Sequence, residues 1–132
     1  MLLIGLQNPA TQDVLADGII ALGSTYRKFD APNDCGTLAF SPTATGLTLN
    51  RKGIYHVTAT FYPSAAFTGT ITLNVNGTPT AATANGENLT IDYYVLVDCS
   101  CGWSSNSQTI TFTSDAAVTL NNVVVNVTKE VS

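Results

Sequence analysis

The chain has 132 residues, of which 45% are apolar and only 11% are charged, and its formal net charge at pH 7 is −4. This length suits a single domain with its own hydrophobic core, and the composition excludes an intrinsically disordered chain. A nucleic-acid-binding protein needs a basic face for the phosphates, and a sequence pI near 4.5 argues against one. The scarcity of charge also indicates that part of the surface is covered, often by another copy of the chain.

The N-terminal stretch MLLIGLQNPATQDVLADG carries an apolar run that stops at Leu6. It lacks a basic start and is too short for a signal peptide or a membrane span, so we expect synthesis in the cytoplasm and no membrane partner. We interpret residues 1–16 as an extended arm, with a first strand as the alternative. Residues 17–132 then form one domain, because no linker or repeat interrupts them.

Nearly every periodic segment alternates apolar and polar residues with a period of two, which is typical of β-strands. Asn76-Gly77 is a strong hairpin signal. Residues 80–88 and the other links rich in Gly, Ser and Asn predict turns. We therefore predict an all-β protein, an antiparallel jelly-roll sandwich of about eight to ten short strands. The predicted strands, in chain order, lie at residues 18–23, 25–29, 46–50, 53–63, 69–77, 88–98, 108–114 and 117–131.

The strand at 53–63 has two faces of different character, because alternate residues of a strand share a face. One is a clear core face, whereas the second carries no charged residue and several β-branched ones. Apolar residues also reach the second face at 88–98 and 117–131. A sheet whose outer face is half apolar is usually covered, most economically by a symmetric copy. The core face holds Tyr55, Val57, Ala59 and Phe61, and the second face holds Ile54, His56, Thr58, Thr60 and Tyr62.

The stretch LTLNRKGIYHVTATF, followed by GTITLNVNG, resembles the tumour-necrosis-factor/C1q-like jelly-roll superfamily. There, a strand that opens with Gly-x-Tyr-x-Val packs in the inner sheet of a trimeric sandwich. The stretches QNPATQDVLADGIIALGSTYRKF, CGTLAF, DYYVLVDCSC and VVVNVTKEV extend the resemblance over nearly the whole chain. With them, the chain is similar to small C1q-like proteins encoded by tailed bacteriophages and prophages.

The resemblance implies a homotrimer and a structural virion protein. We expect a capsid decoration (cement) protein that docks on the phage major capsid protein through its N-terminal arm and lies on the capsid surface. The alternative is a trimeric adhesion or receptor-binding module for a host-surface or mucin glycan, which would usually need a shaft for display. The side opposite the tyrosine faces the threefold interface in this superfamily, which implies interface positions at Ile54, His56, Thr58, Thr60, Tyr94, Leu96 and Val124.

His56 is the one histidine of the chain and lies mid-strand among threonines. A catalytic base needs an adjacent nucleophile in a cleft, so we expect a packed or interface histidine that is hydrogen-bonded to a neighbour. Three copies on a threefold axis would alternatively bind an anion or a metal. Paired carboxylates are sparse, and Asp92 and Asp98, six residues apart on one strand, are too distant for a glycosidase pair. Phosphate-binding glycine loops and metal-ligand motifs are missing from the sequence, so we expect no enzyme and no cofactor.

Three cysteines, Cys35, Cys99 and Cys101, leave three interpretations open. They are reduced thiols, or one disulfide joins Cys35 to either of the other two, or they form a three-thiolate metal site. The paired C-x-x-C spacing of structural zinc sites is absent. Trp103 lies in a predicted loop, where it either contacts a glycan or a partner or caps the end of the sandwich.

Overall fold

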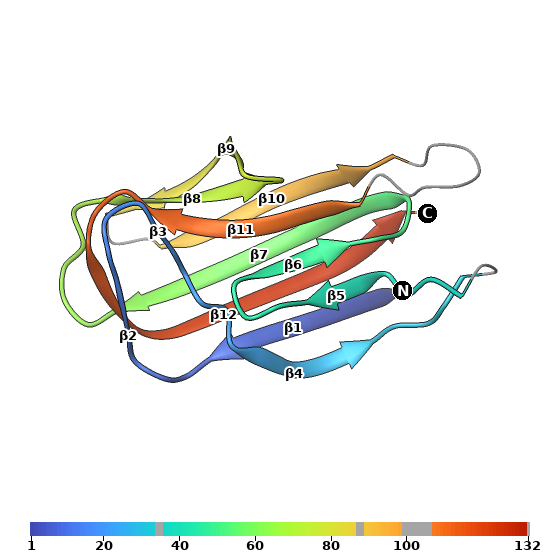
Figure 1. Ribbon diagram of the computed structural model, residues 1–132, viewed down its shortest axis with the longest axis horizontal. Helices are drawn as coiled ribbons and strands as arrows, with labels where there is room; N and C mark the ends of the chain where they lie inside the picture. Colours follow the sequence, from blue (N-terminus) through green and yellow to red (C-terminus); the bar gives the residue numbers. More distant parts are fainter. Residues whose placement is uncertain (34–35, 87–88, 99–106, 132) are drawn as a thin grey trace.

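The computed structural model of the chain describes residues 1–33, 36–86, 89–98 and 107–131 (Figure 1). Every regular element in these ranges is a β-strand, so the all-β prediction is confirmed. Within the same ranges, no helix is long and apolar enough to cross a membrane.

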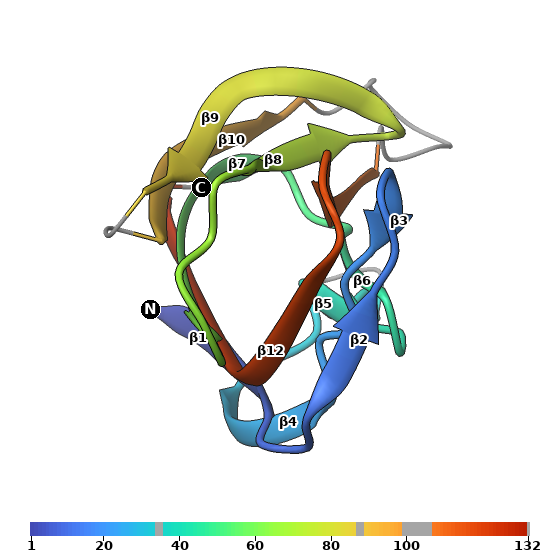
Figure 2. The ribbon, with the colours of Figure 1, turned by 90° about the vertical axis from the view of Figure 1, so that its left-hand side faces the viewer.

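The strands form two antiparallel sheets that pack as the two layers of a sandwich (Figures 1 and 2). This is the predicted jelly-roll architecture. Sheet A has the order β10 (Thr90–Val97), β7 (Gly53–Pro63), β12 (Val118–Val131), β1 (Leu2–Asn8) and β4 (Ser24–Phe29), with β2 (Gln12–Val14) paired to β12. Sheet B has the order β5 (Phe40–Pro42), β6 (Gly46–Leu49), β11 (Gln108–Ser114), β8 (Thr70–Val75) and β9 (Thr78–Asn85), with β3 (Gly18–Ile19) paired to β11.

The structure has twelve strands in its described part, more than the sequence predicted. The additional strands are β1 and β9, with seven and eight residues, and the short β2 and β5, with three residues each, whereas β3, with two residues, lies within the predicted strand at 18–23. A segment of two or three residues cannot show a period of two, so such strands leave no signal in the sequence. They exist because neighbouring strands supply their hydrogen-bond partners.

Near its N-terminus the chain forms β1, an interior strand of sheet A, which corrects the interpretation of residues 1–16 as an extended arm. β1 lies between β12 and β4, with Leu2 opposite Lys129 and Asn8 opposite Val123. The side chains of Ile4 and Leu6 are only 1% exposed. The physical reason is that the apolar side chains of this segment are buried in the core, and its backbone is hydrogen-bonded to a neighbouring strand on each side. The segment is therefore part of the sheet. The alternative interpretation, a first strand, describes the molecule.

The core lies between the two sheets and is built by the alternation that the sequence predicts. In β7, Tyr55, Val57, Ala59 and Phe61 are buried and the residues between them are partly exposed. The rings of Phe61 and Phe112 bring the two sheets together edge to face, with centroids 5.4 Å apart. The Tyr55 hydroxyl donates a hydrogen bond of 2.6 Å to the carbonyl oxygen of Arg51, and burial raises the pKa of Tyr55 to about 12.

The hairpin predicted at Asn76-Gly77 is confirmed, and both residues adopt positive φ, 52° and 81°. These values fit the type I′ turn that matches the twist of two antiparallel strands. The turn directs the chain back along β8 as β9, so the prediction that residues 80–88 form a turn is wrong for Thr80–Asn85. The small side chains of Ala82 and Ala84 are the buried positions of β9, and alanine carries little strand signal in a sequence.

A pair of leucine substitutions tests whether the N-terminal segment belongs to the core. We expect Leu6→Ala to lower the free energy of unfolding by about 2–5 kcal/mol, because it leaves a cavity between the sheets. Leu15→Ala serves as the control, since Leu15 is 77% exposed, and should change stability by less than about 0.5 kcal/mol. Urea unfolding followed by tyrosine fluorescence measures both. Equal, small effects would show that the N-terminal segment is an arm after all.

Candidate interaction surface

The outer face of sheet A, the face turned away from the core, is assembled by the register of its strands. His56 of β7 lies opposite Tyr94 of β10 on one side and Thr128 of β12 on the other. Thr128 in turn lies opposite Leu3 of β1, and Leu3 opposite Phe29 of β4. Residues that face each other in antiparallel strands project to the same side, so these five side chains form one row across the sheet.

The residues predicted for the trimer interface all lie on this outer face. Ile54 is opposite Leu96, and Thr60 is opposite Val124. The structure therefore brings together side chains of three strands that are far apart in the sequence, and their role as an interface stays a prediction. The set is Ile54, His56, Thr58 and Thr60 of β7, Tyr94 and Leu96 of β10, and Val124 of β12.

Large apolar side chains stand exposed on the same face. Leu96 is 60% exposed, Tyr94 58% and Phe29 62%, and Tyr26 and Tyr62 are about half exposed. Single exposed apolar residues are normal, whereas several on one face mark an interaction site. The sequence alone did not assign Tyr26 and Phe29 to this face. The alternation within residues 24–29 does not reveal that β4 pairs with β1.

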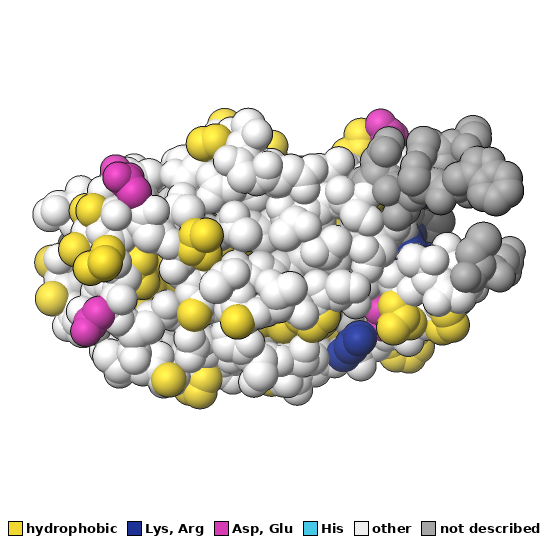
Figure 3. All heavy atoms as spheres, viewed as in Figure 1, with side chains coloured by type: hydrophobic (Ala, Val, Ile, Leu, Met, Phe, Trp, Pro, Cys, Tyr) yellow, Lys and Arg dark blue, Asp and Glu magenta, His cyan; other side chains and the backbone are white. Residues whose placement is uncertain are grey.

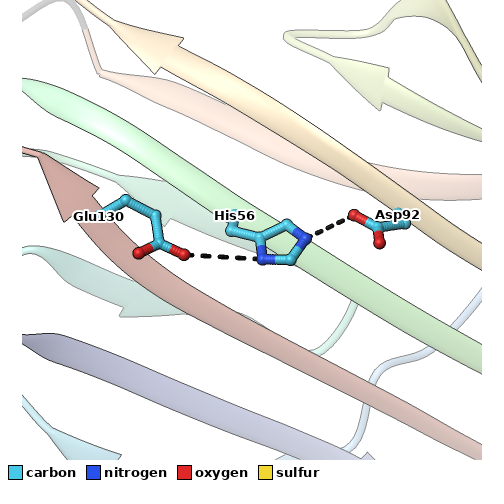
Figure 4. A network of polar contacts seen from close by, with 3 residues as sticks. All are labelled: His56, Asp92 and Glu130. Atoms are coloured by element: carbon cyan, nitrogen blue, oxygen red, sulfur yellow. Dashed lines mark hydrogen bonds and ion pairs between the residues drawn. The ribbon is translucent and has the colours of Figure 1, made fainter.

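His56 lies at the centre of a polar cluster on this face (Figure 4). Its Nε2 is 2.5 Å from Oδ1 of Asp92 on β10, and its Nδ1 is 3.7 Å from Oε1 of Glu130 on β12. The imidazole also stacks on the Tyr94 ring, with centroids 4.5 Å apart and planes inclined by 12°. The predicted hydrogen bond of His56 to a neighbour is thus confirmed, and the cluster ties the three strands β10, β7 and β12 together.

A second polar cluster surrounds Asn126 of β12 and joins this strand to β4, across β1. The Tyr26 hydroxyl donates to Oδ1 of Asn126 at 2.6 Å, and the Arg27 guanidinium donates to the same oxygen at 2.9 Å. Gly5 makes room for this arrangement, since a Cβ there would lie 2.6 Å from Cε1 of Tyr26. The tyrosine ring therefore lies flat over β1 and covers the backbone of the glycine.

The chemistry of the surface favours binding over catalysis. Both ring nitrogens of His56 contact carboxylates, and among the described residues neither contacts a hydroxyl or thiol that it would activate. Among the described residues, no group of three His, Cys, Asp or Glu side chains is arranged to hold a metal ion. Cys35, Cys99, Cys101 and Trp103 lie outside the described residues, so their predicted roles stay predictions.

No family model and no curated protein sequence matches the chain. Solved structures do match it, with low sequence identity over nearly their whole length. The PRD1 vertex protein P5 is 14% identical with a TM-score of 0.61, over 96% of this chain and 93% of that one. Rabbit GITRL is 11% identical with a TM-score of 0.62, over 98% and 94% of the two chains.

The globular domain of zebrafish complement 1qA protein matches in the same way. It is 9% identical with a TM-score of 0.61, and the match covers 98% of this chain and 97% of that one. At such identities the likeness concerns the path of the backbone rather than any individual side chain. The chain has the C1q/TNF-like jelly-roll fold that its sequence motifs predicted.

Proposed function

We propose that this chain is a structural protein of a virus particle and works as a homotrimer closed through the outer face of sheet A. The observation that carries the proposal is the exposure of large apolar side chains on that face, Tyr94 and Leu96 on β10 at one edge and Phe29 on β4 at the other. A protein named as the vertex protein of PRD1 has the same fold, which supports the assignment to a virion. A homo-oligomer with threefold symmetry offers three like docking patches to a shell.

The charges on the outer face of sheet A are compatible with burial between subunits. Asp92 and Glu130 both contact His56 of the same chain, and the Arg27 guanidinium donates to Oδ1 of Asn126. The rest of the central strands contributes threonine, valine and asparagine, whose burial costs little when their polar groups find partners across the interface. The apolar side chains supply the free energy of association as they leave water.

Within the virion, we propose capsid decoration, with docking on the major capsid protein. The docking surface is not an N-terminal arm, because β1 is enclosed in sheet A and provides no free segment. In a trimer closed through sheet A, sheet B and the ends of the sandwich face outward and remain accessible to the shell. The second candidate is an adhesion module for a host-surface glycan, which is favoured by the hydroxyl-rich outer face of sheet B.

The number of copies in purified virions separates the two candidates. Decoration requires the chain at the abundance of a shell component, that is, in numbers comparable with the major capsid protein. An adhesion module at a vertex or tail requires only a few copies per particle. Quantitative mass spectrometry with isotope-labelled peptides measures the ratio. A chain absent from virions would contradict both roles.

A charge placed on the outer face of sheet A tests the trimer. Leu96→Lys puts an ammonium group where the proposal expects apolar contact, so we expect the dissociation constant of the trimer to rise by about 100-fold or more. The control is Leu15→Lys, the same change at an exposed leucine that lies outside the strands of sheet A. Sedimentation equilibrium measures the association of both. A wild-type chain that remains monomeric at high concentration, or equal association of the two variants, would refute the interface.

A further inference from the structure

A groove crosses the outer face of sheet B, on the side of the sandwich opposite to the candidate interaction surface. It has a volume of about 500 Å³, which lies within the ~300–1,000 Å³ of small-molecule sites. β8 and β11 form its floor, and Ile19 and Pro79 stand at its sides. Figure 3 looks onto this face and shows mainly uncharged polar side chains and backbone, with few charged groups.

The floor of the groove is a set of paired hydroxyl and amide groups. Thr72 lies opposite Thr113, and Asn74 lies opposite Thr111. Asn74 is only 5% exposed, and its Nδ2 donates to Oγ1 of Thr113 at 3.1 Å. Asn74 lines the groove, so its side-chain amide offers a ligand both a donor and an acceptor.

Two carboxylates complete the lining. Asp17 is held in a left-handed conformation, φ 63°, where its backbone N–H donates to the carbonyl of Ser114 at 2.7 Å. Asp115 accepts the backbone N–H of Thr70 with Oδ1 at 2.7 Å and also lines the groove. No lysine, arginine or histidine lines the groove. The groove therefore offers acceptors and hydroxyl groups to a ligand rich in O–H donors and repels an anion.

We propose that this groove binds a neutral sugar unit of a glycan. A pyranose ring carries several O–H groups for Asn74, Asp17, Asp115 and the threonine hydroxyls, and it has C–H faces for contact with Ile19 and Pro79. The site is independent of the trimer interface, because it lies on the other sheet. In a trimer closed through sheet A, three grooves face outward, and their combined binding strengthens a weak single-site affinity.

Binding to immobilised glycans tests the proposal. The intact protein is applied to neutral hexose and N-acetylhexosamine oligosaccharides, to sialylated and sulfated ones, and to a spermine-coated surface. We expect retention on at least one neutral glycan and none on the anionic ones. The double variant Thr111→Val and Thr113→Val keeps the shape and strand preference of the floor but removes its hydroxyls, so the affinity should fall about tenfold or more.

The matched control is Thr83→Val, the same change on β9, outside the groove but on the same face of sheet B. It should bind as the wild type does. Retention on spermine in place of neutral glycans would overturn the proposal, and so would preference for anionic glycans, equal binding by the double variant and the control, or no binding to any neutral glycan. Sedimentation of the same samples shows whether the trimer persists, so failure of the sugar site and failure of the trimer are distinguished.

Discussion

The pairing of β1 with β12, which joins the two ends of the chain at the middle of sheet A, supports the rest of the structure. β12 is the longest strand and also pairs with β7, so every row on the outer face crosses it. Without β12, sheet A would separate into β10–β7 and β1–β4, and the core would open to water. The contact pairs residues as far apart in the sequence as Leu2 and Lys129, and the cost of closing such a loop grows only slowly with its length.

The strands of the sandwich give each of its two outer faces a distinct chemistry. Sheet A exposes tyrosine, leucine and phenylalanine around a histidine that lies between two carboxylates. Sheet B exposes threonine hydroxyls, and the almost buried side chain of Asn74 lies among them. Apolar surface suits contact with a like subunit, whereas hydroxyl and carboxylate groups suit a polar ligand in water. The proposed association and the proposed recognition are therefore separated by the thickness of the core.

Much of the candidate surface was predictable from β7, because its bounds at Gly53–Pro63 and its two faces follow from strict alternation. The hydrogen bond of His56 was expected, but its partners were not. Asp92 and Glu130 come from strands on either side of β7, and their identity depends on register. For the same reason the contact between Tyr26 and Asn126 was not predicted. It depends on a β-bulge that shifts the register of β4 against β1.

The alternation of apolar and polar residues is enough to establish an all-β sandwich and the core face of each long strand, and the Asn76-Gly77 dipeptide predicts the turn. It is a local property, since the backbone of any strand turns successive side chains to opposite sides. The place of β1 between β12 and β4, the row from Tyr94 to Phe29 and the groove above Asn74 were decided only in three dimensions. They depend on which distant strands become neighbours and in which register, a choice made by packing of the whole core.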